Sequence, residues 1–398
     1  MKYLIISDAA SMHIYNFIKN SLLGRGYDIY ILRHSVMDIP EEYRVFYEEN
    51  DITVFSPGKS TDKRTHFFTT LRFFKKCAFL MKLGKVDVCH IHYAHQSSCV
   101  LYKMFRFNFR KMILSFWGTD ILNPPKNEAK QQVSVLKYAD AITCTVEHTK
   151  EIFRQRFGQK YDSKLFFGRF AAGALSFIKK YSTQISREEC RKSFNIPDGK
   201  ICVVCGYNAN PAQHQDIILN EFSQLPTEYI EKIHLIIPMQ YNVIDSDYVM
   251  HVKSLAASCG YTYDILEEYV PFERNAQLSL ATDIYLNFRD TDAFSNAMKE
   301  QLYAGSLMIQ GSWLVYEELD QIKANVIKID SIIQLHEIIP SIIDNYIIPS
   351  DHQLFEPLYK IFSIESARHS WDNVLNKVGV IFNIFIAFLS MSLILYGV

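Results

Sequence analysis

The stretch 292–311, DAFSNAMKEQLYAGSLMIQG, constrains the fold more than any other part of this chain. The apolar run 283–288 before it has the composition and length of a buried parallel strand. Helix-forming residues cover 296–304, and Gly305 follows where a left-handed residue commonly ends a helix. A second strand begins at Leu307. The pattern predicts a β-α-β unit with a polar loop at the carboxyl end of its first strand, where open α/β sheets bind ligands.

The loop and the helix of this unit carry two acids eight residues apart, Asp292 and Glu300. An acid in the loop and an acid on the helix can face one bound molecule. The helix N-terminus beside them, at Ser295 and Asn296, suits a phosphate because its N–H groups are unpaired. An acidic cap followed by a solvated helical glutamate is the simpler interpretation that the pattern leaves open.

The spacing of the two acids resembles the EX7E motif of GT-B glycosyltransferases, in particular family 4. In that family the second acid binds the ribose of a nucleotide-sugar and the first touches the transferred sugar. The resemblance therefore implies ribose binding by Glu300 and sugar contact, as a catalytic residue, by Asp292. Asp in place of the first Glu, and Gln301 in place of the usual Ala, depart from the family pattern. Further donor-binding residues predicted here are Ser295, Asn296, Phe294 and Arg289.

The first residues of the chain predict another β-α-β unit. Strand patterns cover 3–7 and 27–32, with an amphipathic helix at about 14–23 between them. The first loop lacks the G-x-G-x-x-G phosphate fingerprint, which argues against a nicotinamide enzyme. His13 opens the helix on the ligand side of the sheet, so it is a candidate to contact the acceptor or the donor phosphate. A helix-capping or solvated histidine is the open alternative.

Three more segments, 86–93, 112–121 and 139–153, resemble strands and helices of family 4 in the same order. The second segment resembles the "HGtD" segment of the family, with Trp117 where many members carry His. The resemblance makes Asp120, just past this turn, a candidate to bind the acceptor or orient a neighbour. A turn aspartate without a special role is the open alternative.

Residues 201–205 begin a second predicted sheet, followed by the loop 206–215. In family 4 this loop carries Arg and Lys residues that bind the donor diphosphate, whereas here His214 is the only candidate cation. Neutralising the leaving diphosphate is the main electrostatic task of the transfer. Residues predicted to take over this task are Gly206, Asn208, Asn210, His214 and Arg289, with Tyr269 predicted to lie over the nucleobase. The region 200–320 also resembles family 56, the bacterial 4-acetamidofucosyl transferases.

The sequence predicts an α/β protein of GT-B fold, with two Rossmann-like domains facing a cleft and a C-terminal hydrophobic helix. The predicted domains are 1–178 on the acceptor side and 201–350 for the nucleotide-sugar, joined by a polar linker at 179–200. Helices in 351–377 are expected to cross back to the first domain, as the "fsW" helix does in GT-B proteins. The last 21 residues, 378–398, carry no charge and predict a transmembrane or membrane-anchoring helix. A buried final helix is the alternative.

Charge and aromatic residues indicate a membrane surface rather than nucleic acid as a partner. The net charge of −1 gives no global attraction to nucleic acid. Residues 59–85 interleave basic and aromatic side chains around a single acid, Asp62, and 102–111 repeats the pattern. Such a basic, aromatic helix suits an anionic membrane. Aromatic core residues beside a solvated basic face are the alternative.

These features predict a glycosyltransferase that moves a sugar from a nucleotide-sugar to a lipid-linked glycan in bacterial surface polysaccharide synthesis. The expected place is the cytoplasmic face of the inner membrane, peripheral or tail-anchored. No cofactor or metal is expected, because the family 4 resemblance implies a metal-independent reaction. The family 4 resemblance implies retention of configuration, and family 56 would imply inversion. The alternatives are a non-catalytic GT-B accessory subunit, favoured by the missing Arg/Lys pair, and a nucleotide-sugar epimerase.

Overall fold

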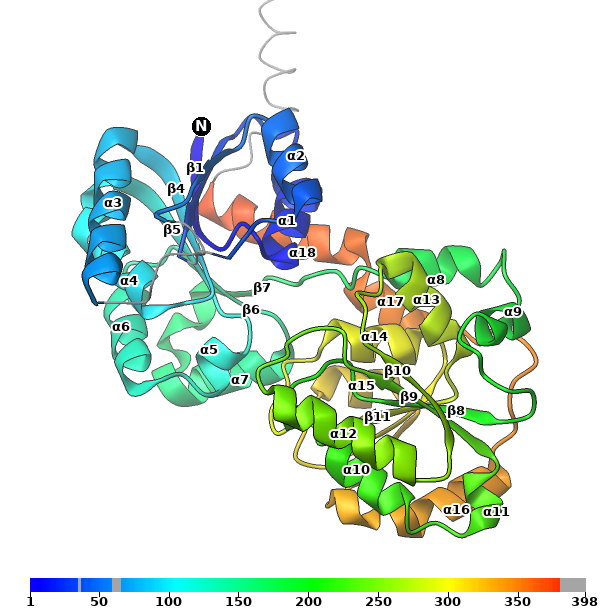
Figure 1. Cartoon of the computed structure of the whole chain (residues 1–398). Coiled ribbons are helices and arrows are strands. Elements are labelled where there is room, and N and C mark those ends of the chain that lie inside the picture. Colours follow the sequence, from blue (N-terminus) through cyan, green and yellow to red (C-terminus); the bar gives the residue numbers. More distant parts are fainter. Residues whose placement is uncertain (35–36, 59–65, 380–398) are drawn as a thin grey trace, which may run out of the picture. The chain divides into compact units, whose positions relative to one another are not determined.

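The computed structural model describes residues 1–34, 37–58 and 66–379. The chain divides into two compact units (Figure 1). One unit consists of Met1–Phe170 and the segment that begins at Ile364, and the other consists of Ala171–Ser363. Each unit is built on its own parallel sheet.

The sheet of the first unit has, among the described residues, seven parallel strands in the order β3-β2-β1-β4-β5-β6-β7. The strands are β1 (Lys2–Ser7), β2 (Asp28–Arg33), β3 (Thr53–Phe55), β4 (Val86–His92), β5 (Phe109–Ser115), β6 (Ala141–Cys144) and β7 (Leu165–Phe167). The chain first builds the sheet outward from β1 to β3 and then returns to add β4 beside β1. This reversal is a topological switch point, beyond which ligands bind in open α/β sheets.

Helices cover both faces of this sheet (Figure 1). They are α1 (Met12–Phe17), α2 (Glu41–Glu49), α3 (His66–Leu83), α4 (Gln96–Phe105), α5 (Thr119–Leu122), α6 (Lys126–Leu136), α7 (Glu147–Phe157) and α18 (Ile364–Val378). Helices α3, α4, α6 and α7 share one apolar core with the strands, and α1, α2 and α18 share the other. Trp371 of α18 is buried there, and its indole Nε1–H donates to the Arg169 carbonyl oxygen over 2.9 Å.

The sheet of the second unit, all of whose residues the structure describes, has six parallel strands in the order β10-β9-β8-β11-β12-β13. They are β8 (Ile201–Cys205), β9 (Ile233–Pro238), β10 (Thr262–Leu266), β11 (Ile284–Asn287), β12 (Leu307–Gly311) and β13 (Val326–Ile329). The helices are α8 (Leu175–Tyr181), α9 (Arg187–Lys192), α10 (Gln215–Phe222), α11 (Thr227–Ile230), α12 (Ser246–Ser258), α13 (Phe272–Ala281), α14 (Asn296–Tyr303), α15 (Glu317–Ile322), α16 (Leu335–Asn345) and α17 (Glu356–Phe362). Helices α10, α12 and α16 share a core with one face. The switch point lies between β8 and β11.

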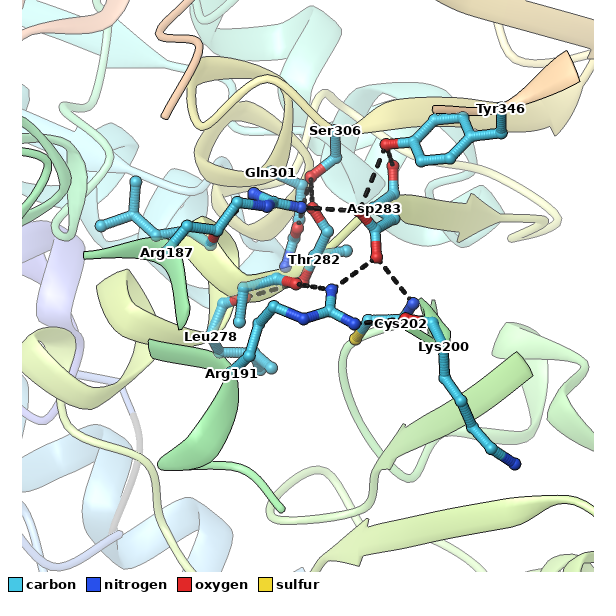
Figure 2. Close-up of polar contacts among 12 residues, drawn as sticks. Arg187, Arg191, Lys200, Cys202, Leu278, Thr282, Asp283, Gln301, Ser306 and Tyr346 are labelled. Carbon is cyan, nitrogen blue, oxygen red and sulfur yellow. Dashed lines mark hydrogen bonds and ion pairs between the residues drawn. The ribbon is translucent and has the colours of Figure 1, made fainter. Parts of the chain in front are cut away.

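The polar segment 179–200, which the sequence predicts as a linker, lies within the unit Ala171–Ser363. Helix α9 carries Arg187 and Arg191 on successive turns, and both guanidinium groups bind the buried carboxylate of Asp283 over 2.7 Å (Figure 2). The backbone N–H of Cys202 donates to the same carboxylate over 2.7 Å. Two of the charged residues in this segment therefore belong to an internal ionic cluster.

The last two helices, α17 and α18, belong to different units. Helix α17 stays with the second unit, whereas α18 packs on the sheet of the first unit, as expected for a helix that crosses back. Of the predicted membrane segment 378–398, only Val378 and Gly379 fall among the described residues. Within the described ranges, no helix combines the length and hydrophobicity needed to cross a membrane.

Candidate functional site

The predicted donor-binding residues gather on the two loops that flank the switch point of the second sheet. The loop after β8 carries Gly206, Asn208 and His214, and the loop after β11 carries Arg289 and Asp292. Because β8 and β11 are paired in parallel, both loops leave the same edge of the sheet. This is the position where the topology predicts a ligand.

Asp292 is held at the entrance of α14. Its Oδ2 accepts the Ser295 backbone N–H and the Tyr316 hydroxyl, both over 2.9 Å. Ser295 caps the helix, with its Oγ accepting the Met298 N–H over 3.4 Å. The Asn296 side-chain oxygen accepts from the Lys299 ammonium over 3.4 Å. One carboxylate oxygen of Asp292 is therefore held both by its own loop, through Ser295, and by Tyr316.

Glu300 lies on the inner face of α14 and is 2 % exposed. One carboxylate oxygen accepts the Ala174 N–H over 3.1 Å, and the other accepts from the Asn275 side-chain amide. Burial raises the pKa of Glu300 to about 7, although both of these bonds oppose the rise. Each carboxylate oxygen can accept two hydrogen bonds, so capacity for a ligand hydroxyl remains.

Two polar contacts join the loops across the switch point. The guanidinium Nη1 of Arg289 donates to the Tyr207 hydroxyl over 2.5 Å. The imidazole Nε2 of His214 lies 2.8 Å from Oδ1 of Asp290. The Trp313 indole N–H donates to the Arg289 carbonyl oxygen over 2.8 Å. Arg289 and His214, the two candidate cations, are therefore each in contact with a residue of the opposite loop.

The loop after β8 is shaped by its own side chains. Gly206 has φ +69°, and a Cβ there would lie 2.7 Å from Oε1 of Gln213, so only glycine fits. The Asn208 side-chain oxygen accepts the Asn210 N–H over 3.0 Å and the Gln213 amide over 3.2 Å. Asn208 is buried and Gly206 N–H is bonded to Leu286. These residues set the conformation of the loop through hydrogen bonds within the protein.

The sequence interpretation missed a buried polar group at the heart of this site. Tyr285 of β11 is fully buried, and its hydroxyl has no hydrogen-bond partner among the described residues. Burial raises the pKa of Tyr285 well above its usual range, and Tyr207, Asp292 and Glu300 add to the rise. The side-chain oxygens of Asn287 and Gln310, which are register partners on β11 and β12, likewise lack partners in the described part. Unpaired buried oxygens are costly, and such groups call for a ligand or water.

Two further predicted donor residues differ in their exposure to solvent. Phe294 adopts φ 65° and is 1 % exposed, packed between Tyr316 and Phe362 with ring-centre distances of 5.0 and 4.9 Å. Its ring is therefore in the core beneath the loop rather than at its surface. Tyr269, predicted to cover the nucleobase, is 72 % exposed on the loop after β10.

Asp120 in the first unit is buried and organises backbone. Its Oδ1 accepts the N–H groups of Trp117 and Gly118, and its Oδ2 accepts the N–H of Ala94, each over 2.9 Å. Burial raises the pKa of Asp120 to about 6, against the effect of these three bonds. The geometry makes Asp120 a residue that joins the loops after β4 and β5.

His13 lies among aromatic rings at the carboxyl edge of the first sheet. Its imidazole centre is 4.6 Å from the ring centre of Phe170 and 5.3 Å from that of Trp117. The Trp117 indole N–H donates to Nδ1 of buried His92 over 3.4 Å. The rings of His13 and Trp117 are therefore neighbours, and Asp120 accepts the backbone N–H of Trp117.

Sequence and structure comparisons agree on the class of fold. The sequence model of the family described as glycosyl transferase 4-like matches residues 2–146, most of the first unit. No curated protein sequence matches the chain significantly. The match supports the predicted resemblance to family 4 in the unit that carries it.

Solved structures of GT-B proteins resemble both units. HepE from Anabaena, in complex with UDP and glucose, is 14% identical, with a TM-score of 0.59 over 98% of this chain and 100% of that chain. WaaG, described as a glycosyltransferase involved in lipopolysaccharide biosynthesis, is 13% identical, with a TM-score of 0.60 over 96% and 100%. UDP-GlcNAc 2-epimerase from Neisseria meningitidis bound to UDP-GlcNAc is 12% identical, with a TM-score of 0.58 over 95% and 99%. These likenesses confirm the GT-B fold for the chain.

Proposed function

We propose that the chain transfers a sugar from a nucleotide-sugar to a lipid-linked glycan in bacterial surface polysaccharide synthesis. The observation that carries the proposal is the pair Asp292 and Glu300, held on the loop and helix at the switch point of the second sheet. The family match in the first unit supports the same activity. HepE was solved with UDP, which makes UDP the first nucleotide to test.

In this proposal the two loops divide the donor between them. Glu300 holds the ribose hydroxyls through the lone pairs that Ala174 and Asn275 leave unused. Asp292 contacts the transferred sugar. Arg289 and His214 supply positive charge for the leaving diphosphate, in place of the Arg/Lys pair of family 4. Fixed charge at that point lowers the barrier because it stabilises the charge that develops during transfer.

The reaction class follows from the family resemblance. The proposed transfer retains configuration and uses neither metal nor cofactor, with the donor diphosphate itself accepting the proton from the acceptor hydroxyl. Among the residues near Asp292, none is assigned as a separate base. His13 and Trp117, at the edge of the first sheet, form the proposed contact surface for the acceptor sugar.

Helix α3 supports a peripheral place on the cytoplasmic face of the inner membrane. It exposes an apolar stripe at helical spacing, consisting of Phe67, Leu71, Phe74, Ala78 and Met81. Lys75 and Lys82 lie exposed beside the stripe, and α3 contains no acid. A basic helix with an exposed apolar stripe binds anionic lipid surfaces.

Nucleotide binding is the first test of the donor site. The unfolding temperature is measured with UDP, GDP, dTDP and ADP for the wild type, Glu300→Ala and Glu337→Ala, the last an exposed glutamate of the same unit. Binding to the folded state adds about 2.7 kcal/mol at a hundredfold excess over Kd. We expect a shift with one nucleotide that is lost in Glu300→Ala and kept in Glu337→Ala. No shift with any nucleotide would favour the accessory-subunit interpretation.

A nucleotide-sugar epimerase is the second candidate, because the Neisseria epimerase shares the fold. The two activities differ in their need for an acceptor. The purified chain is incubated with the nucleotide-sugar whose nucleotide gives the shift, with and without a lipid-linked glycan, and the products are analysed by mass spectrometry and NMR. A changed sugar without acceptor indicates the epimerase, whereas sugar transfer that depends on acceptor supports the proposed function.

A further inference from the structure

A cluster of basic and imidazole side chains lies at the switch point of the first sheet, outside the proposed donor site. Asp8 follows β1, Arg33 ends β2 with His34 next to it, and His95 follows β4. Since β1 lies between β2 and β4 in the sheet, the three strand ends lie side by side. This is the ligand-binding edge of the first unit by the same topological rule that applies to the second.

The members of the cluster hold one another in place. Arg33 binds Asp8 over 3.0 Å and donates to the Ser56 hydroxyl over 3.0 Å. The imidazoles of His34 and His95 are stacked, with centres 5.7 Å apart and planes inclined by 13°. Nδ1 of His34 is buried and has no partner among the described residues. The arrangement therefore offers a nitrogen that the described protein atoms leave unused.

Lys76 adds a buried positive charge to this cluster. It lies on α3 and is 6 % exposed, yet it forms no hydrogen bond or ion pair with any residue that the structure describes. Burial lowers the pKa of both His34 and His95, and the charge of Lys76 lowers both further. Burial lowers the pKa of Lys76 itself to about 8. A lysine this buried has no counter-ion among the described residues, and an anionic ligand would stabilise its charge.

The nearby carboxylates do not compensate Lys76. Asp8 is bound by Arg33, as described above. Glu128 accepts the Gln96 N–H over 3.4 Å and lies 3.9 Å from Nε2 of His95. The stacked histidines are neutral near pH 7 because burial lowers the pKa of each, so Lys76 is the positive charge beside them that no ion pair within the described residues offsets.

We propose that Lys76, His34 and His95 bind a phosphate or diphosphate group in the first unit, and that this group links the acceptor glycan to its lipid. The assignment to the acceptor rests on the proposed function, whereas the anion site stands without it. Helix α3 connects the two parts of the proposal, since Lys76 lies on its inner face and the stripe Phe67, Leu71, Phe74 lies on its outer face. A lipid held by the outer face would bring its phosphate to the level of Lys76.

The test is pyrophosphate binding to the purified full chain, measured by calorimetry at saturating UDP so that the donor site is filled. The variants are Lys76→Met, which keeps the length and removes the charge, and Lys75→Met, the exposed neighbour on the same helix. We expect Lys76→Met to weaken binding at least about tenfold, as loss of a charge-assisted contact does, and Lys75→Met to leave it unchanged. Equal affinities in the two variants, or no binding by the wild type, would overturn the site.

Vesicle binding then identifies the source of the phosphate. Phosphatidylcholine vesicles contain either phosphatidic acid, with its exposed phosphomonoester, or phosphatidylglycerol at matched surface charge. A preference for phosphatidic acid that Lys76→Met abolishes supports a lipid-linked phosphate. Pyrophosphate binding without that preference overturns the lipid assignment and indicates a soluble phosphate compound.

A measurement on the wild type avoids dependence on the folding of a variant. Reductive methylation of lysines is followed by mass spectrometry with and without pyrophosphate at saturating UDP. Protection of Lys76 but not Lys75 supports the site, and equal labelling of Lys76 in both samples contradicts it. The UDP-induced thermal shift reports the donor site separately, so failure of one proposal is distinguishable from failure of the other.

Discussion

Buried polar groups along strand β11 differ in whether they have hydrogen-bond partners. At the amino end, Asp283 is fully buried and both of its oxygens are bound, by Arg187, Arg191 and the Cys202 N–H. Further along the strand, the hydroxyl of Tyr285 and the side-chain oxygen of Asn287, the last residue of β11, have no partner in the described part of the chain. A polar network in which every hydrogen bond is formed stabilises the fold. Buried groups without partners at a ligand-binding edge of the sheet remain able to form hydrogen bonds with a ligand.

The difference separates stability from function within one strand. Burial alone does not distinguish the ends, because all of these side chains are buried. What differs is whether a neighbouring element supplies the partner: α9 does so for Asp283, and no described element does so for Tyr285. Substitutions at the first end should therefore cost stability, and those at the second should cost ligand affinity.

The largest expected effect is at the satisfied end. Asp283→Ala leaves the guanidinium groups of Arg187 and Arg191 buried without their acid, so we expect the free energy of unfolding to fall by about 3–5 kcal/mol. Urea denaturation measures the loss. Asp351→Ala, an exposed acid of the same unit, serves as the control. A loss below about 1 kcal/mol would show that the cluster does not stabilise the second unit.

Glu300 should show the next largest effect, as a dependence on pH. Burial raises its pKa in the folded state from 4.5 to about 7. Between these values the unfolded chain releases a proton that the folded chain keeps, so this group's contribution to stability is lost as the pH rises toward 7. The loss amounts to about 3 kcal/mol and levels off above pH 7.

The matched variant is Glu300→Gln, which cannot titrate and whose amide the Asn275 side chain can meet after a flip. Denaturation from pH 4 to 8 gives the difference between wild type and variant. We expect Glu300→Gln to gain on the wild type as the pH rises. A difference that stays constant with pH would contradict the buried, pKa-raised carboxyl.

Asp120 extends the comparison to the first unit, because its oxygens are occupied as those of Asp283 are. Asp120→Asn turns an amide toward one of the N–H groups of Ala94, Trp117 and Gly118, so we expect a loss of about 2 kcal/mol. Asp162→Asn, an exposed acid of the same unit, should change stability by less than about 0.5 kcal/mol. Unchanged stability with lost transfer activity would instead favour direct contact of Asp120 with the acceptor.

Local patterns predicted the secondary structure around the candidate donor site well. The helix expected at 296–304 is α14 at Asn296–Tyr303, capped by Ser295, and Gly305 has φ 95° as a left-handed helix end requires. The strand expected at 283–288 is β11 at Ile284–Asn287. These features depend on propensity and capping, which neighbouring residues determine.

Features that depend on residues far apart in the sequence could not be predicted from local patterns. The carboxylate of Asp120 is bound by Ala94, a residue of another loop, and Phe294 packs on Phe362 of α17. Tyr285 was counted as part of an apolar run, although Tyr285 and Asn287 alternate with core residues and so share the other face of β11. Lys76 was assigned to a basic helix surface, whereas the structure buries it. Alternation within the strand was the one available signal.

The smallest effect on stability, and the sharpest test of the comparison, is expected for Tyr285→Phe. Removing a hydroxyl that has no partner among the described residues should leave the free energy of unfolding unchanged or raise it by up to about 1 kcal/mol. If the hydroxyl binds the donor, UDP or UDP-sugar affinity should fall about tenfold. Denaturation and calorimetry on the same samples give both values.

Tyr316→Phe is the matched control, because Tyr316 is also buried but its hydroxyl donates to Asp292 over 2.9 Å and accepts from Asn287 over 3.2 Å. Its loss should cost about 1 kcal/mol of stability. The comparison of the two ends of β11 requires the two variants to differ in sign or size of this effect. Tyr285→Phe could instead be destabilised as much as Tyr316→Phe while nucleotide affinity stays intact. Tyr285 would then belong with Asp283 among the structural groups, and the main evidence that the carboxyl end of β11 binds the donor would be lost.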